Sequence, residues 1–200
     1  MSFIKTISYK EADSSLKRLY DKVKGPNDVI DNIMLAHSLR PHTMIGHMAL
    51  YKNVLHHKNN TMPKWFLETI GVYVSLLNNC NYCVDHHFEG LKRLLNDDIK
   101  SELIKTKLIT NSYETIFDKD YSLILRYAEN LTKNIIQISE KQIDELKNEG
   151  VSDGQILEIN QVISYFNYAN RTVLGLGVST DGDVLGLSPN DSNDENWNHK

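Results

Sequence analysis

The 200-residue sequence contains only two cysteines, Cys80 and Cys83. A secreted protein held together by disulfides spreads several bridges along a much shorter chain, so this class is excluded. The sequence also lacks an unbroken apolar run of the ~20 residues that cross a bilayer, and its N-terminal residues lack the apolar core of a signal peptide. These absences predict a cytoplasmic protein without a membrane partner, whose close cysteine pair serves redox or metal chemistry.

The sequence has no excess of positive charge, because it contains 22 lysines and arginines against 26 aspartates and glutamates, and the formal net charge is -4. The basic residues are scattered along the chain rather than gathered into a stripe, which argues against a nucleic-acid partner. Hydrophobic residues make up 40% and charged residues 24% of the sequence, as in ordinary globular proteins. We therefore expect a packed, globular protein that does not bind nucleic acid.

The turn-rich pattern of short alternating strands is missing, whereas apolar residues recur at three- and four-residue steps along most of the chain. The predicted fold class is therefore all-α. Residues 1–187 are expected to form one helical domain, and the polar residues 188–200, which have little to bury, a disordered tail. The expected helices cover residues 11–24, 29–36, 41 to a polar end at 56–60, 63 to 78–79, 80–95, 98–108, 118–133, 139–150 and 152–174.

The densest group of reactive side chains lies in the segment from Asn78 to His87. On a helix that turns about 100° per residue, Cys83 lies about 60° and His87 about 20° from Cys80, so all three project from one face. His87 is four residues after Cys83, close enough for its imidazole to take the thiol proton and stabilise the thiolate. Backbone N–H groups of a first helical turn stabilise a thiolate further. His86 points further round the helix, and we expect it at the surface or at an interface rather than as the base.

Glu68 interrupts the apolar face of the preceding helix, twelve residues before Cys80. If the chain reverses at Asn78-Asn79, an antiparallel pair of helices brings Glu68 and His87 to heights that differ by roughly a few ångströms. A carboxylate beside an imidazole orients the ring and raises its basicity. Taken alone, Glu68 would be interpreted as a solvated helix residue, but the cysteines and the histidine in register with it favour a place beside His87.

These residues together resemble a known signature. Their order is Glu68, eleven residues, Cys80-x-x-Cys83, three residues and His87. This order is similar to the motif of the alkylhydroperoxidase D-like (AhpD-like) branch of the carboxymuconolactone decarboxylase superfamily. Residues 163–178 and 38–41 are similar to its peroxidase-related subgroup, so the resemblance covers most of residues 1–187. It implies an AhpD-like bundle in which a central helical hairpin carries the C-x-x-C motif, and homo-oligomers, trimers or hexamers, with the redox centre in a cleft near a subunit contact.

The resemblance also implies roles for single residues. Cys83 is the thiol that reacts with the peroxide, Cys80 is the resolving thiol, and Glu68 with His87 forms the proton relay. The implied reaction is the reduction of organic hydroperoxides or hydrogen peroxide through a Cys80–Cys83 disulfide, which an unidentified dithiol donor reduces again without any cofactor. The best-known members carry a histidine immediately before the second cysteine, and Tyr82 occupies that place here, so one relay group is absent or replaced.

Zinc binding is an alternative, because Cys80, Cys83, His86 and His87 are all possible ligands. Adjacent histidines diverge on a helix, however, and no second C-x-x-C completes the usual tetrahedral set, so we expect no metal. A thioredoxin-like role would need a strand–helix context that the chain lacks. Two further alternatives are a non-peroxidatic dithiol–disulfide oxidoreductase and a helical oligomeric binding protein that keeps the C-x-x-C for structure.

Other conspicuous side chains are expected to serve structure rather than chemistry. The polar residues of the final helix are expected to hydrogen-bond within the oligomer or, as the less favoured alternative, to line the substrate cleft: Asn167, Asn170 and Arg171. The histidines expected to be solvated or at an interface are His42, His47, His56 and His57. The aromatic residues expected in the core or at an interface are Tyr9, Tyr51, Trp65, Tyr73, Phe166 and Tyr168.

Overall fold

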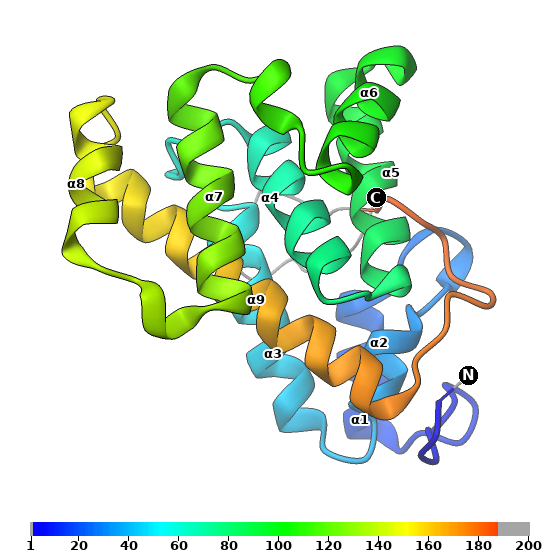
Figure 1. The fold of residues 1–200 in the computed structure, drawn as a ribbon. Coiled ribbons are helices and arrows are strands. Elements are labelled where there is room, and N and C mark those ends of the chain that lie inside the picture. Colours follow the sequence, from blue (N-terminus) through cyan, green and yellow to red (C-terminus); the bar gives the residue numbers. More distant parts are fainter. Residues whose placement is uncertain (1, 188–200) are drawn as a thin grey trace.

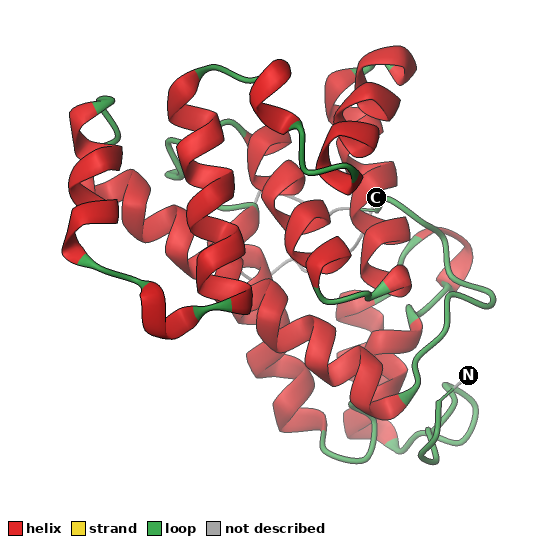
Figure 2. Cartoon of the chain, viewed as in Figure 1, coloured by secondary structure: helices red, strands yellow, loops and turns green. Residues whose placement is uncertain are grey.

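The computed structural model describes residues 2–187, and this part of the chain contains helices and no strand (Figure 2). The predicted all-α fold class is confirmed, while the tail predicted for residues 188–200 lies outside the described residues. No helix within residues 2–187 combines the length and the apolar character that a membrane crossing needs. The α-helices are α1 (Ser14–Val23), α2 (Asn32–Ala36), α3 (Pro41–Leu55), α4 (Lys64–Leu77), α5 (Asn81–Leu95), α6 (Asp98–Ile109), α7 (Lys119–Lys133), α8 (Glu140–Asn148) and α9 (Asp153–Leu176), and 3₁₀ turns lie at Pro26–Asp28, Tyr113–Thr115 and Ile135–Gln137.

The helix ends depend on local capping that hydrophobic periodicity does not show. Asp13 accepts a hydrogen bond from a backbone N–H of the first turn at 2.8 Å, so α1 begins at Ser14 and not at the predicted residue 11. α2 begins at Asn32 rather than at residue 29, because Val29 and Asp31 have extended backbone conformations, with ψ of 133° and 142°. Gly177, with a φ of 61°, ends α9 beyond the predicted residue 174.

α4 lies at the centre of the fold, where it packs against α5, α7 and α9 (Figure 1). Every residue from Phe66 to Ser75 is buried. α5 follows α4 after only the three residues Asn78–Cys80, and Asn79 has a φ of 56° in the left-handed region, which lets the chain reverse. α4 and α5 therefore run antiparallel, and Glu68 on α4 is buried within the fold.

α9 crosses α4 at a glycine. A Cβ atom on Gly71 would lie 2.2 Å from Cζ of Phe166, so only glycine lets these helices approach so closely. The Phe166 ring is fully buried and meets the His87 imidazole edge to face, with 4.5 Å between ring centroids. The crossing of α4 and α9 thereby helps to set the position of a predicted site residue on α5.

Replacing Gly71 with alanine is expected to lower the free energy of unfolding by about 1–3 kcal/mol, because the added methyl group would displace Phe166 from a filled core. Gly46→Ala is the matched control, since Gly46 lies within α3 and has nothing within 4 Å of an added Cβ. Helix propensity makes the control neutral or stabilising by up to about 1 kcal/mol. Urea unfolding measures both free energies. Equal stabilities of the two variants would contradict the close approach at Gly71.

Candidate active site

The two cysteines lie at the start of α5, and both are free, buried thiols. Cys80 is the N-cap residue, one position before the first helical residue, and Cys83 lies in the first turn. Their sulfur atoms are 2.6 Å apart. A small movement would suffice for an S–S bond of about 2.05 Å, so the pair is placed for reversible disulfide formation.

The two thiols differ in acidity. The pKa of Cys80 is lowered, first because the Cys83 thiol donates a hydrogen bond to its sulfur and then because the backbone N–H of Cys83 acts in the same direction, and together these effects outweigh burial. The pKa of Cys83 is raised well above its ordinary value, mainly by burial and further by its bond to Cys80. The first proton that the pair loses therefore leaves the negative charge on Cys80.

Glu68 and His87 are joined by a hydrogen bond between α4 and α5. Oε2 of Glu68 lies 2.7 Å from Nδ1 of His87, and Glu68 is only 2% exposed. The helical register of the sequence predicted these two side chains to be neighbours, and the distance agrees with that register. A carboxylate on Nδ1 fixes the orientation of the ring and leaves Nε2 for proton exchange.

A second histidine lies beside the same carboxylate. Nε2 of His56, the C-cap residue of α3, is 3.9 Å from Oε1 of Glu68. His56 was expected to be solvated or at an interface, and it is instead buried within the chain, where it is only 6% exposed. The end of α3 packs toward α4, and no local pattern in the sequence signals that contact. Within residues 2–187, no group of three or more histidine, cysteine, aspartate and glutamate side chains is arranged to hold a metal ion.

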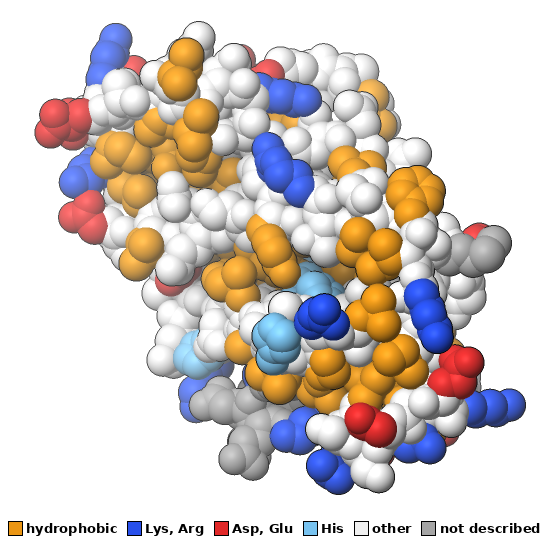
Figure 3. Space-filling view, turned by 90° about the horizontal axis from the view of Figure 1, so that it is seen from below, with side chains coloured by type: hydrophobic (Ala, Val, Ile, Leu, Met, Phe, Trp, Pro, Cys, Tyr) orange, Lys and Arg blue, Asp and Glu red, His pale blue; other side chains and the backbone are white. Residues whose placement is uncertain are grey.

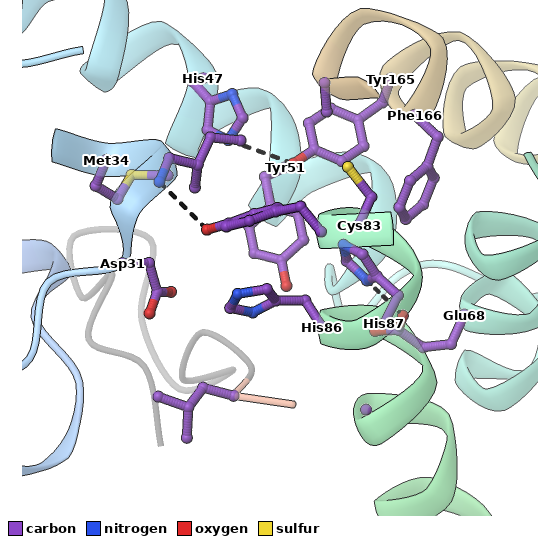
Figure 4. A pocket seen from close by; sticks show the side chains of 15 residues that line it. Asp31, Met34, His47, Tyr51, Glu68, Cys83, His86, His87, Tyr165 and Phe166 are labelled. Atoms are coloured by element: carbon purple, nitrogen blue, oxygen red, sulfur yellow. Dashed lines mark hydrogen bonds and ion pairs between the residues drawn. The ribbon is translucent and has the colours of Figure 1, made fainter. Parts of the chain in front are cut away.

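A cavity of about 50 Å³ lies beside Cys83 and the Glu68–His87 pair (Figure 4). This is room for a few water-sized molecules. Glu68, His87 and Cys83 line the cavity, whereas Cys80 is not among its lining residues. The Cys83 side chain points toward Tyr165 of α9 (Figure 4). A molecule in the cavity therefore meets Cys83, although Cys80 is the more acidic thiol.

Two buried tyrosines supply polar groups on the cavity wall. The rings of Tyr51 and Tyr165 stack with 5.5 Å between centroids, and the Tyr165 hydroxyl is 3.4 Å from Nε2 of His47. Burial raises the pKa of Tyr51 and of Tyr165 well above the ordinary value, so both phenols stay protonated. His47, which was also expected to be solvated or at an interface, is buried between α3 and α9 and only 3% exposed. The sequence offered no signal for this pairing of distant helices.

Tyr82, between the two cysteines, takes part in a separate network. Its hydroxyl donates to Oδ2 of Asp183 at 2.8 Å and accepts from the backbone N–H of Ile33 at 3.2 Å. Nε2 of His86 lies 3.2 Å from the same Asp183 oxygen. His86 was expected at the surface or at an interface, but its side chain is only 13% exposed and lines the cavity. Asp183 was missed because it lies in a polar, turn-rich stretch without a motif.

The polar residues of α9 bond within the chain. Nδ2 of Asn78 donates to the side-chain oxygens of Asn167 and Asn170 at 3.1 and 3.0 Å. Asn170 is fully buried and also donates to Ser75, while Arg171 donates to Asn167. These bonds tie α9 to the α4–α5 turn, so the expectation of contacts within an oligomer is not needed to explain these side chains.

Comparisons with known proteins give matches among solved structures. No protein-family model matches the chain, and no curated protein matches it. A peroxidase-related protein with an alkylhydroperoxidase AhpD core from Ralstonia eutropha JMP134 is similar over 91% of this chain and 93% of that chain, with a TM-score of 0.76 and 18% identity. A peroxidase-related protein from Silicibacter sp. TM1040 is similar over 90% of each chain, with a TM-score of 0.71 and 21% identity.

The debrominase Bmp8 is a further structural neighbour, with a TM-score of 0.68 and 15% identity over 88% of this chain and 91% of that chain. A cysteine-to-alanine variant of Bmp8 in complex with 2,3,4-tribromopyrrole is similar as well, with a TM-score of 0.66. Identities this low compare folds and not activities. The predicted AhpD-like fold is confirmed by these neighbours.

Because the pKa of Cys80 is lowered by its hydrogen bonds, the first thiolate of the pair is predicted to form on Cys80. Cys83→Ala removes the largest cause of the lowered pKa of Cys80, so its thiolate is expected to appear at higher pH than in the wild type. Ultraviolet thiolate absorbance against pH measures the shift. Cys80→Ala is the matched control, in which burial still raises the pKa of Cys83. Thiolate formation in Cys83→Ala at the same pH as in the wild type, or at a lower pH, would contradict this order.

Proposed function

Because the chain has the fold of AhpD-like, peroxidase-related proteins, we propose that it is a thiol peroxidase that reduces hydrogen peroxide or organic hydroperoxides. One observation carries the proposal: a cavity holds a thiol that has a second thiol at 2.6 Å and an imidazole oriented by a buried carboxylate. This is the arrangement of nucleophile, resolving group and proton carrier that peroxide reduction by a dithiol requires. Cys83, Cys80, His87 and Glu68 are the proposed catalytic and positioning residues.

Attack begins at Cys83, the cysteine that lines the cavity. Its proton passes to the Cys80 thiolate, 2.6 Å away, or to His87, and the resulting Cys83 thiolate attacks one oxygen of the peroxide. The O–O bond breaks, Cys83 becomes a sulfenic acid, and the departing alkoxide or hydroxide takes a proton and leaves as alcohol or water. We assign the delivery of that proton to His87, which Glu68 holds in place.

Cys80 then resolves the oxidised sulfur. The Cys80 sulfur attacks the Cys83 sulfur, the S–S bond forms, the S–O bond breaks, and the oxygen leaves as water. A dithiol donor returns two electrons and two protons and restores both thiols, so the cycle uses no cofactor. We place this cycle in the cytoplasm, whose reducing systems regenerate dithiols.

Reductive debromination is a second candidate, favoured by the likeness to Bmp8. Its balance is similar: the dithiol supplies two electrons and two protons, a C–Br bond is replaced by C–H, bromide and a proton leave, and the disulfide forms. The aromatic wall formed by Tyr51, Tyr165 and Phe166 offers a stacking surface to a flat ring, although the cavity of about 50 Å³ would have to widen to admit one. Bromide release from a bromopyrrole, without peroxide consumption, would favour this candidate over the first.

We also propose that the protein assembles into homo-oligomers, trimers or hexamers. Figure 3 shows apolar side chains in several exposed groups on one face of the molecule. Exposed apolar residues include Ile45 and Leu50 of α3 and Tyr168 and Leu174 of α9. Apolar surface of this kind supports burial against another subunit. The mass of the particle in solution tests the proposal, and a 23.0 kDa monomer would contradict it.

Cys83→Ser is expected to lower the rate of peroxide consumption about a thousandfold or more, because it removes the proposed nucleophile. The matched control is Cys80→Ser, in which Cys83 still reacts once but lacks a resolving thiol, so mass spectrometry should find sulfenic and then sulfinic acid on Cys83. Wild-type protein treated with one equivalent of peroxide should instead show the internal disulfide. Consumption by Cys83→Ser at the wild-type rate would exclude the peroxidase mechanism and leave a structural role for the motif.

Glu68→Gln is expected to lower the peroxidase rate by about tenfold to a hundredfold, because a neutral amide orients His87 less firmly and does not support its positive charge. Glu102→Gln is the control, since Glu102 is an exposed carboxylate on α6. The pH profile of the rate distinguishes a relay from a merely structural role, because loss of the relay also changes its shape. A Glu68→Gln profile parallel to that of wild type would contradict the relay.

A further inference from the structure

Residues 178–187, here called the strap, return from the end of α9 and run beside α5 (Figure 1). Nδ2 of Asn32 on α2 donates to two strap carbonyls, and Arg93 on α5 donates to a third. Leu187 at the end of the strap lines the cavity that holds Cys83. The strap therefore forms part of the cavity wall and is fastened to two different helices.

Asp183 is the polar centre of the strap. Its side chain is only 2% exposed, and it accepts hydrogen bonds from the Tyr82 hydroxyl at 2.8 Å and from the backbone N–H of Asn32 at 3.0 Å. Nε2 of His86 lies 3.2 Å from the same carboxylate. A carboxylate that loses water on burial needs such donors. Asp183 thus joins the strap to α2 and α5 at once.

Tyr82 connects this anchor to the redox centre, because it lies between Cys80 and Cys83 in the sequence. Its ring lies against His86 with 4.5 Å between centroids, and its hydroxyl bonds both the strap and α2. Burial raises the pKa of Tyr82 well above its ordinary value, so the phenol remains a donor to Asp183. Tyr82 therefore serves as an attachment point for the strap.

We infer that Asp183 is a positioning residue that holds the strap closed over the cavity, and that the closed strap restricts the substrate to small hydroperoxides. The substrate class rests on the proposed peroxidase function, whereas closure of the cavity does not. A cavity of about 50 Å³ accommodates hydrogen peroxide or a short alkyl hydroperoxide and leaves no space for an aromatic one. Opening the strap would remove the wall at Leu187 and admit larger molecules to Cys83.

Alkylation of Cys83 tests closure without any peroxide. We compare iodoacetamide, a small reagent, with a fluorescein maleimide, a bulky one, and peptide mapping assigns the adduct to Cys83. Asp183→Asn is expected to raise the rate of Cys83 alkylation by the bulky reagent about tenfold or more. The rate with the small reagent should rise less than about twofold, because only the bulky reagent needs an open strap. The control is Asp181→Asn, an exposed strap residue, which should change neither rate. Equal acceleration of both reagents by Asp183→Asn would overturn the inference.

Two glycines of the strap provide a test that leaves the bonds of Asp183 unaltered. Gly182 and Gly186 both have positive φ, 86° and 73°, so alanine is strained at either position. Only at Gly186 does an added Cβ collide, 2.7 Å from Cβ of Glu89 on α5. Gly186→Ala should therefore raise the rate of Cys83 alkylation by the bulky reagent about tenfold more than Gly182→Ala does. Equal rates for the two variants would contradict closure by the strap.

The substrate class is tested with hydrogen peroxide and cumene hydroperoxide. Asp183→Asn is expected to raise kcat/KM for cumene hydroperoxide relative to hydrogen peroxide by about tenfold, mainly through KM, because the change affects entry and not the dithiol. An unchanged ratio would overturn the assigned class. If neither the wild type nor the variant consumes peroxide, the proposed function fails. The alkylation rates still show whether the strap closes the cavity.

Discussion

The buried carboxylate of Glu68 is the interaction on which the arrangement of the site depends. It lies in a stretch of α4 that has no exposed residue, where an unpaired charge would cost roughly several kcal/mol. His87 meets this carboxylate from α5, and His56 approaches it from the end of α3. A shift of α5 by one turn would move His87 away from Glu68 and leave the carboxylate without this hydrogen bond. The register of α4 against α5, and with it the place of Cys83, is therefore tied to a single charged group.

Cys80 is the more acidic thiol, whereas Cys83 is the thiol that a molecule in the cavity can reach. The hydrogen bond that lowers the pKa of Cys80 keeps the proton on Cys83, yet Cys83 is the one that lines the cavity. The reactive thiolate can then arise by moving one proton across 2.6 Å instead of by releasing a proton to solvent. Peroxide reduction and reductive debromination both require two electrons from this pair of neighbouring sulfurs. Under either proposal, the identity of the molecule that is reduced depends on the cavity wall rather than on the dithiol.

That wall is built from parts of the chain that are far apart in sequence. Tyr165 comes from α9, His47 and Tyr51 from α3, and Leu187 from the strap. The close crossing at Gly71 brings α9 into place, and hydrogen bonds of Asn78 to α9 hold the α4–α5 turn against it. Each wall element is thus fixed by contacts outside the C-x-x-C motif, so cavities of different shape can surround the same redox pair.

The sequence by itself determined the features that depend on short-range helical periodicity. The helices followed from apolar spacing, and the meeting of Glu68 with His87 followed from counting residues on either side of one tight turn. Only the tertiary structure decided that His47 and His56 are buried, that Asp183 lies beside Tyr82, and that Cys80 is the more acidic thiol. The physical reason is that burial and pKa depend on which distant surfaces exclude water and donate hydrogen bonds, and no local repeat in the sequence encodes that.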